Sequence, residues 1–326
     1  MAQVLVTGVG GAGGTATVRS LRQHTDHHVV GVDMDENATG FLFVEEYSTV
    51  PAANASTWPN VMANLVDEYD IGVIVPLVDE ELARLERLRA VLPDSVGVVA
   101  PQQPVIDTTL DKYTVTQTLA RAGISVPSTV VGSEWEDHDL SYPLIGKPRH
   151  GRGSRGVERL DSSDDIESYL TSTDNAPEEV VLQECIDGTE YTTSVVSTRN
   201  DRLLSIVPKE VLLKEGNTIH GATRAAQSVE TACRDIYYTL EPHGPLNVQQ
   251  IVADGEPYTI EINPRFSSTA CLTVAAGVNE LDLLIRDHLG ESVSPVQSFV
   301  PDRHLIRYLS HTIRDETDLH PPMRER

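Results

Sequence analysis

The segment at residues 261–266, EINPRF, places a carboxylate, an amide and a guanidinium close together, with a proline before the arginine. If residues 258–263 form a strand, Glu261 and Asn263 share one face, and the isoleucines beside them face a core. Oxygen donors fixed on a strand suit a hard cation such as Mg²⁺, which also binds water and nucleotide phosphates. The alternative is a strand end whose polar side faces solvent, so other parts of the chain must decide.

Two glycine clusters could bind phosphate. In the first, Gly8, Gly10 and Gly13 fit the G-x-G-x-x-G pattern after a strand and before a helix, and Asp33 ends the next strand at the spacing of a ribose-binding acid. This pattern is compatible with dinucleotide binding. The same turn could hold a carboxylate at the helix N-terminus, or only let the helix pack closely on the sheet.

The second glycine cluster is PLIGKPRHGRGSRGVERL, residues 143–160. A strand delivers Lys147, and a loop follows that contains Gly151, Gly153, Ser154 and Gly156. Backbone N–H groups of such a loop can contact phosphate oxygens, while the lysine supplies a positive charge. The G-x-x-x-x-G-K order of a Walker loop is absent, and a hairpin that simply requires glycine is the alternative.

The order of the expected helices and strands predicts two regions of different fold class. Residues 1–105 alternate strand-length apolar runs with helical segments, which indicates a small α/β domain with a parallel, Rossmann-like sheet. From about residue 106 one helix is followed by many short strands rich in Val, Ile and Thr, which indicates an α+β fold with antiparallel sheets. The sequence DGEP at 254–257 predicts a turn that pairs the strands on its two sides.

The composition limits the partners. A formal net charge of -24 argues against a nucleic-acid partner, because phosphate backbones are bound by concentrated positive charge. The excess of acids over lysines resembles adaptation to a salty, halophilic cytoplasm. No apolar run is long enough to cross a bilayer and no signal peptide is evident, so we expect a cytoplasmic protein, with a homodimer as the prior for its oligomeric state. The three cysteines lack metal-ligand spacing, and we expect them to be packing residues.

Several separated motifs in one order resemble the ATP-grasp superfamily, most closely its branch similar to the carbamoyl-phosphate-synthase large subunit, with a single grasp module. The motifs, which lie between about residues 111 and 276, are DK ending at Lys112, KP at 147–148, GRGSRG at 151–156, QECIDGTEY at 183–191, NVQ ending at Gln249, and EINPR at 261–265. The resemblance implies a pre-ATP-grasp α/β domain over 1–105 and an ATP-grasp domain over 106–300. Within the latter it implies a glycine-rich lid subdomain at about 115–185, and residues 301–326 are expected to form a C-terminal tail.

The resemblance also implies roles for individual residues. ATP would be contacted by Lys112, Lys147, the loop residues Gly151, Gly153, Ser154 and Gly156, the segment Glu184, Cys185 and Ile186, and by Glu190, His220 and Gln249. Mg²⁺, or Mn²⁺ in its place, would be held by Gln249, Glu261 and Asn263. The catalytic set would be Lys147, Arg265, Glu261 and Asn263, with Arg265 facing the transferred phosphoryl group.

Two of these assignments carry alternatives, and so does one pair of acids outside the set. Gln249 lies across from Glu261 if Ala253 opposes Pro257, whereas a slip by one residue would substitute Gln250. His220 could instead be a structural hydrogen-bonding residue. The acids at 79 and 80 could shape an acceptor site, but carboxylates on a surface helix are the expected interpretation.

The function that this set predicts is an ATP-dependent ligase. It would activate a small-molecule carboxylate as an acyl phosphate for attack by an amine or a related nucleophile, and release ADP and phosphate. The alternatives are an NAD(P)-dependent oxidoreductase that uses Gly8, Gly10, Gly13 and Asp33, and a non-catalytic ATP-binding module.

Overall fold

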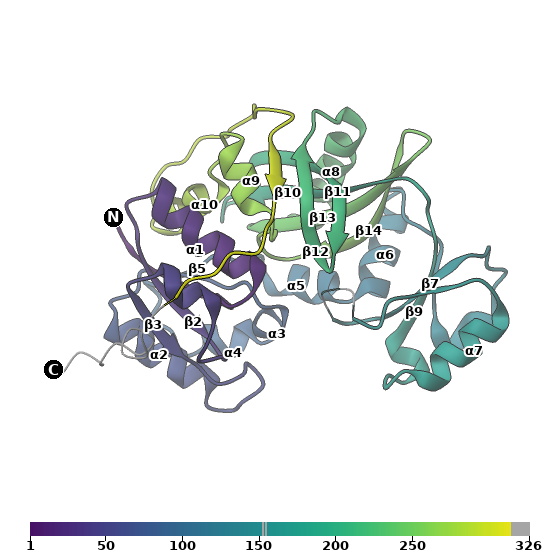
Figure 1. The fold of residues 1–326 in the computed structure, drawn as a ribbon, viewed down its shortest axis with the longest axis horizontal. Coiled ribbons are helices and arrows are strands. Elements are labelled where there is room, and N and C mark those ends of the chain that lie inside the picture. The colour runs from purple at the N-terminus through teal and green to yellow at the C-terminus, as the bar shows by residue number, and fades with distance from the viewer. Residues whose placement is uncertain (152, 154, 314–326) are drawn as a thin grey trace.

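The computed structural model describes residues 1–151, 153 and 155–313. It contains three sheets, and Figure 1 shows the N-terminal sheet and the small sheet that carries β7 and β9 at opposite ends of the molecule. Ser154, which we predicted as a loop contact to ATP, lies outside the described residues. Within the described ranges no helix has both the length and the apolar character needed to cross a membrane.

The first sheet is parallel and has the order β3-β2-β1-β4-β5. Its strands are β1 (Gln3–Thr7), β2 (His28–Asp33), β3 (Glu46–Thr49), β4 (Val73–Val75) and β5 (Gly97–Val98). Its helical segments are α1 (Ala12–His24), η1 (Thr39–Phe43), α2 (Trp58–Glu68), α3 (Asp79–Leu82) and α4 (Leu85–Arg89). The predicted α/β unit is confirmed, and two short helices, α3 and α4, follow β4.

The second sheet has the order β6-β9-β7-β8 and is antiparallel. Two helices lead into it, α5 (Gln103–Leu110) and α6 (Lys112–Arg121). Its elements are β6 (Thr129–Val131), η2 (Gly132–Asp137), β7 (Leu144–Pro148), β8 (Glu158–Leu160), α7 (Ser163–Ser172), η3 (Pro177–Glu179) and β9 (Val180–Glu184). A core of its own, which includes Leu144, Ile166 and Leu182, holds α7 against the strands.

The third sheet has the order β14-β13-β10-β11-β12-β15. Its strands are β10 (Thr189–Ser197), β11 (Leu203–Glu215), β12 (Asn217–Thr223), β13 (Pro245–Ala253), β14 (Glu256–Asn263) and β15 (His304–Ile306), and its helices are α8 (Gln227–Leu240), α9 (Ala270–Ala275) and α10 (Glu280–His288). Both antiparallel sheets are therefore confirmed. The predicted C-terminal tail needs a correction, because β15 pairs with β12 and is part of the sheet.

Three helices, α1, α9 and α10, join the first sheet to the third. Val18 of α1 shares one buried cluster with Ala270 of α9, Leu281 of α10 and Val196 of β10. Burial of this apolar surface contributes about 25 cal/mol per Å². Figure 1 shows α1 beside α9 and α10. Arg265, just after β14, lines the same cavity as Gly8 after β1 and Leu77 after β4, so these ends lie close together.

Candidate functional site

The metal and phosphate motif lies where the β13–β14 hairpin contains a bulge. Ala253 pairs with Glu256, so the turn is one residue tighter than we predicted. The register shifts between Gln249 and Gln250, and this irregularity restores the pairing of Gln249 with Glu261. The predicted partner of Glu261 is thus found, by a route that the sequence did not indicate.

Gln250 is excluded from the site by its burial. Its side chain is fully buried, donates to Thr259 Oγ1 (3.2 Å) and accepts from Cys233 Sγ (3.3 Å). Gln249 on the other face is only partly buried. Of the three cysteines only Cys233 is fully buried, so the expectation that all three pack in the interior holds for that one alone.

Ile260 lies on β14 opposite the register shift, and the burial of its side chain differs from the prediction. We predicted that its side chain faces the core with that of Ile262, but only Ile262 is buried. The carbonyl oxygen of Ile260 accepts a hydrogen bond from Lys147 Nζ (3.2 Å). Lys147 and the strand that carries Glu261 therefore converge, although 113 residues separate Lys147 from Ile260.

Lys147 occupies a buried, polar position. Its Nζ also donates to Gln183 Oε1 (2.8 Å), and Gln183 is held by its own bond to Thr129 Oγ1 (2.9 Å). Burial lowers the pKa of Lys147 to about 8, Glu261 opposes this shift, and the positive charges of Lys112 and Lys214 add to it. A lysine with two fixed acceptors and a depressed pKa is suited to receive an anion that restores its charge.

Lys112 lies at the start of α6. Its Nζ donates to the carbonyl oxygen of Gly151 (2.8 Å), which ties the glycine loop to this helix. Asp111 caps the helix. Arg149 donates two hydrogen bonds to the same carboxylate, from Nε to Oδ1 (2.8 Å) and from Nη2 to Oδ2 (2.7 Å). Burial raises the pKa of Asp111, but the hydrogen bonds from Arg149 and Thr114 outweigh it and hold the pKa at about 2. We did not predict this ion pair from the sequence.

The glycine loop after β7 is shaped by its backbone. Gly151, Gly153 and Gly156 all have positive φ, of 126°, 70° and 67°. Side chains rarely adopt such conformations, so these positions require glycine whatever the loop does. Its role as a lid stays a prediction.

The other predicted nucleotide contacts are placed as follows. The N–H groups of Glu184 and Cys185 donate to the carbonyls of Ser128 and Pro143, so an adenine contact here would use carbonyl oxygens or the N–H of Ile186. Glu190 forms an ion pair with Lys214 (2.5 Å), which a ribose would have to displace.

His220 lies apart from the β14 end of the sheet. Its Nε2 is 2.9 Å from Nδ1 of His304 on β15, and its strand β12 is separated from β14 by β11, β10 and β13. Four strand spacings amount to about 19 Å. The structural alternative for His220 fits this position.

The glycines after β1 serve close packing. Gly10 N donates to Asp33 Oδ2 (2.7 Å), so the acid proposed for a ribose is already bonded within the turn. A Cβ on Gly14 would lie 2.1 Å from the carbonyl oxygen of Gly8, and therefore only glycine lets α1 approach the turn. This geometry favours the packing interpretation over the dinucleotide one.

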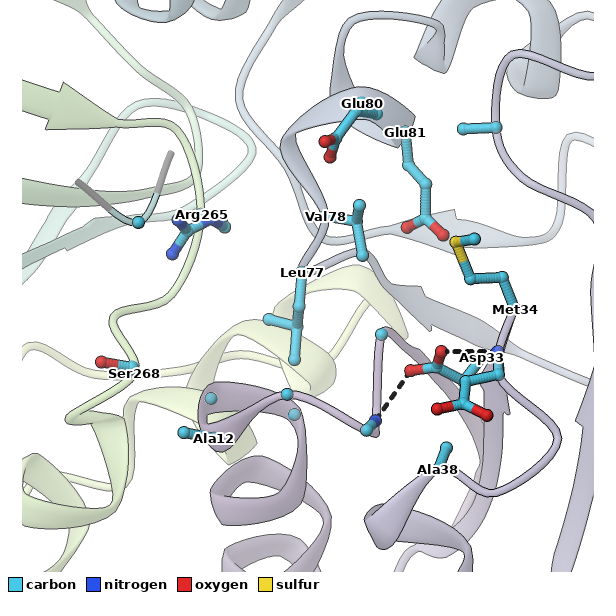
Figure 2. Close-up of a pocket in the computed structure, with 18 of the residues that line it drawn as sticks. Ala12, Asp33, Met34, Ala38, Leu77, Val78, Glu80, Glu81, Arg265 and Ser268 are labelled. Carbon is cyan, nitrogen blue, oxygen red and sulfur yellow. Dashed lines mark hydrogen bonds between the residues drawn. The ribbon is translucent and has the colours of Figure 1, made fainter. Parts of the chain in front are cut away.

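A cavity of about 680 Å³ lies beside this turn. It opens at the carboxyl ends of β1, β2 and β4, where the strand order reverses and ligands of such sheets commonly bind. Figure 2 shows Asp33 and Glu81 on one side, and Arg265 and Ser268 on the other. Gly153 also lines it, so the cavity reaches toward the glycine loop.

Asp79 corrects the expectation of a surface acid. It is buried, and its Oδ1 accepts from Nε of Arg265 (2.6 Å). Its neighbour Glu80 is exposed, so the prediction holds for that residue only.

Replacing Lys147 with Arg provides a test of its titration. The free lysine loses its proton as the pH rises through about 8, so the affinity for Mg·ATP is expected to fall above that pH. The decrease should approach about tenfold per pH unit in the limit where binding takes up one proton. Lys147→Arg stays charged and should show no such decrease. Calorimetric titration between pH 6.5 and 9.5 measures this, and a flat profile for the natural protein would contradict the assignment.

Comparison with known proteins identifies two domains in this chain. Residues 109–269 match the model of an ATP-grasp domain, and residues 4–98 match that of a PylC-like N-terminal domain. The carbamoyl phosphate synthase large chain of Halobacterium salinarum is 26% identical over an alignment of 322 positions, which covers 89% of this chain and 30% of that protein. The chain thus spans about a third of the length of this curated relative.

Solved structures show the same fold. The biotin carboxylase domain of Hydrogenobacter thermophilus 2-oxoglutarate carboxylase, in complex with MgADP, ADP and bicarbonate, has a TM-score of 0.72 at 14% identity and covers 92% of this chain and 72% of its own. N5-carboxyaminoimidazole synthetase from Staphylococcus aureus with ADP gives 0.71 at 17%, covering 90% and 79%. An L-amino acid ligase from Bacillus licheniformis gives 0.66 at 18%, covering 89% and 74%. This chain thus carries a PylC-like N-terminal domain followed by an ATP-grasp domain.

Proposed function

We propose that this protein is an ATP-dependent ligase, which activates a carboxylate as an acyl phosphate and joins it to an amine or a related nucleophile. The observation that carries the proposal is the convergence of Lys147 with β14, through the 3.2 Å bond from its Nζ to the carbonyl oxygen of Ile260. This convergence places a phosphate-binding charge beside the oxygen donors of Glu261 and Asn263. The relatives named above include ligases and carboxylases, which supports the same class.

The donor set fits Mg²⁺ with a nucleotide. Asn263 Nδ2 donates to Glu261 Oε1 (3.1 Å), which orients the carboxylate, and Gln249 lies opposite on β13. In the described part of the chain no group of three or more His, Cys, Asp or Glu residues could hold a metal by itself. One carboxylate and two amides suit Mg²⁺, which keeps waters and takes phosphate oxygens from its nucleotide. Such an ion would supply positive charge at the transferring phosphoryl group.

The protein's own groups would do the remaining work. Lys147 and Lys112 would bind phosphate oxygens, and Arg265 would face the phosphoryl group that the carboxylate attacks. The loop with Gly151, Gly153 and Gly156 would close over them and exclude water, which otherwise hydrolyses an acyl phosphate. The bond between Lys112 Nζ and the carbonyl of Gly151 gives this loop a fixed attachment at the site.

We assign the second substrate to the cavity of about 680 Å³. Its wall includes Arg265, which places any occupant next to the phosphoryl position. The opposite wall carries the acids Asp33, Glu80 and Glu81, which suit a small molecule that bears an amino group.

A carboxylate screen with Mg·ATP and hydroxylamine tests the proposal. Hydroxylamine traps an acyl phosphate as a hydroxamate and reveals the acid before the amine is known. At least one small carboxylate is expected to give both hydroxamate and ADP. ATP binding without ADP release for every acid tested would leave a binding module and would refute the ligase.

We also propose, from the acidic composition, a salty cytoplasm as the working environment. Screening of carboxylate repulsion predicts an unfolding temperature that rises between low and molar KCl. A temperature that falls with KCl would contradict it.

A further inference from the structure

All three nitrogens of the Arg265 guanidinium are hydrogen-bonded. Nε donates to Asp79 Oδ1 (2.6 Å), Nη1 to the carbonyl of Phe266 (3.2 Å) and Nη2 to Asn263 Oδ1 (3.3 Å). The ion pair is largely withdrawn from solvent, with side-chain exposures of 17% for Arg265 and 10% for Asp79. Since arginine has five N–H donors, one on each terminal nitrogen remains for an anionic ligand.

Asp79 reaches this arginine from a rigid part of the first sheet. It begins α3, directly after the segment that follows β4. Thr7 at the end of β1 donates to Glu81 and accepts from Leu77 N (3.1 Å), and Leu82 is fully buried. Asp79 is therefore anchored on both sides of its short helix and can determine where Arg265 points.

The bonds continue into the proposed metal site. Asn263, which accepts from Arg265, donates to Glu261 Oε1 (3.1 Å). A hydrogen-bonded chain thus runs from α3 at the cavity wall through Arg265 and Asn263 to Glu261. Within it Asp79 is the only member that comes from the first sheet.

We propose that Asp79 is a positioning residue for phosphoryl transfer, which acts by orienting and partly neutralising Arg265. The inference rests on the proposed ligase function. A guanidinium held from behind by a carboxylate presents its remaining N–H groups in one direction, whereas a released arginine would sample several rotamers. The PylC-like N-terminal domain thereby completes a phosphoryl site whose other members lie in the ATP-grasp domain.

Asp79→Asn tests this with a matched control. The amide keeps the size of the side chain and removes its charge. Substrate-dependent ADP release is expected to fall about 10- to 100-fold in kcat, the cost of a slightly misplaced catalytic group. The affinity for Mg·ATP should stay within about twofold, because the lysines and the metal donors are intact. The control is Glu210→Gln, which breaks a bond of the same 2.6 Å length, to Arg224, and should leave both quantities unchanged.

A double variant separates positioning from general damage. If Asp79 acts only through Arg265, adding Asp79→Asn to Arg265→Ala should cost less than about twofold further. Asp79→Glu, which keeps the charge but moves it by one methylene, should give an intermediate loss and replaces Asp79→Asn in these comparisons if that variant does not fold. The inference would be overturned if the fold losses in kcat of the two single variants multiplied in the double variant, or if Asp79→Asn were as active as Glu210→Gln. Either result would leave the proposed ligase function intact. If the natural protein released no ADP with any acid, both the proposed ligase function and the role of Asp79 would be refuted.

Discussion

Glu261→Gln is expected to reduce substrate-dependent ADP release by about 10³-fold, the scale at which loss of one key electrostatic group slows catalysis. The amide keeps the size of the side chain, but it removes the only carboxylate among the three proposed metal donors. It also removes the negative charge that opposes the depression of the Lys147 pKa, so that lysine should be less charged at neutral pH. ADP release measured with the acid from the hydroxamate screen gives the comparison.

The same strand offers a control for this variant. Glu256 lies at the other end of β14 and is exposed, so Glu256→Gln should retain the natural rate. Circular dichroism and thermal unfolding should show that both proteins are folded. A Glu261→Gln protein with more than a tenth of the natural rate would contradict the assignment of Glu261 as a metal ligand.

Gly14→Ala is expected to have the largest effect on stability. The added Cβ would lie 2.1 Å from the oxygen of Gly8 and 2.6 Å from Cα of Val9, both of which are backbone atoms. Because neither can rotate away, α1 must move off the sheet and disturb the cluster that it shares with α9 and α10. We expect a loss of about 3 kcal/mol or more in the free energy of unfolding, at the upper end of overpacking effects. Urea unfolding provides the measurement.

Gly11→Ala is the matched control for the packing interpretation. A Cβ there would have no contact closer than 3.7 Å, to the oxygen of Gly8, and the residue has an ordinary φ of -73°. Its cost should stay below about 1 kcal/mol. If Gly14→Ala and Gly11→Ala lost the same free energy of unfolding, close packing at Gly14 would not be the reason for its glycine.

The sequence predicted those parts of the molecule that depend on local pattern. The alternating strand at residues 258–263 placed Ile262 in the core, and the turn predicted at DGEP joins β13 to β14. The pairing of Gln249 with Glu261 was also predicted, although its assumed turn register was wrong by one residue. A bulge depends on how both strands pack, and a single strand's sequence does not specify it.

Contacts between segments that are distant along the chain could not be predicted from the sequence. The bond from Asp79 to Arg265 joins residues 186 positions apart. We predicted Asp79 and Glu80 as carboxylates on a surface helix, which is right for Glu80 and wrong for Asp79. The pairing of Glu190 with Lys214 and the support of Lys147 by Gln183 are of the same kind. Opposite charges along a chain do not reveal which pairs meet, so only the fold could show them. The division into domains at about residue 105, and the lid, remain predictions.

A crystal structure with Mg²⁺ and a non-hydrolysable ATP analogue would show whether nucleotide and metal bind at the end of β14. We expect the triphosphate between Lys147 and β14, with the metal bound by Glu261, Asn263 and Gln249. The terminal phosphoryl group should face Arg265, with the bond from Arg265 to Asp79 retained. A nucleotide bound instead at the turn of Gly8 to Gly13, with Lys147 still bonded to Gln183 and Ile260, would contradict this expectation.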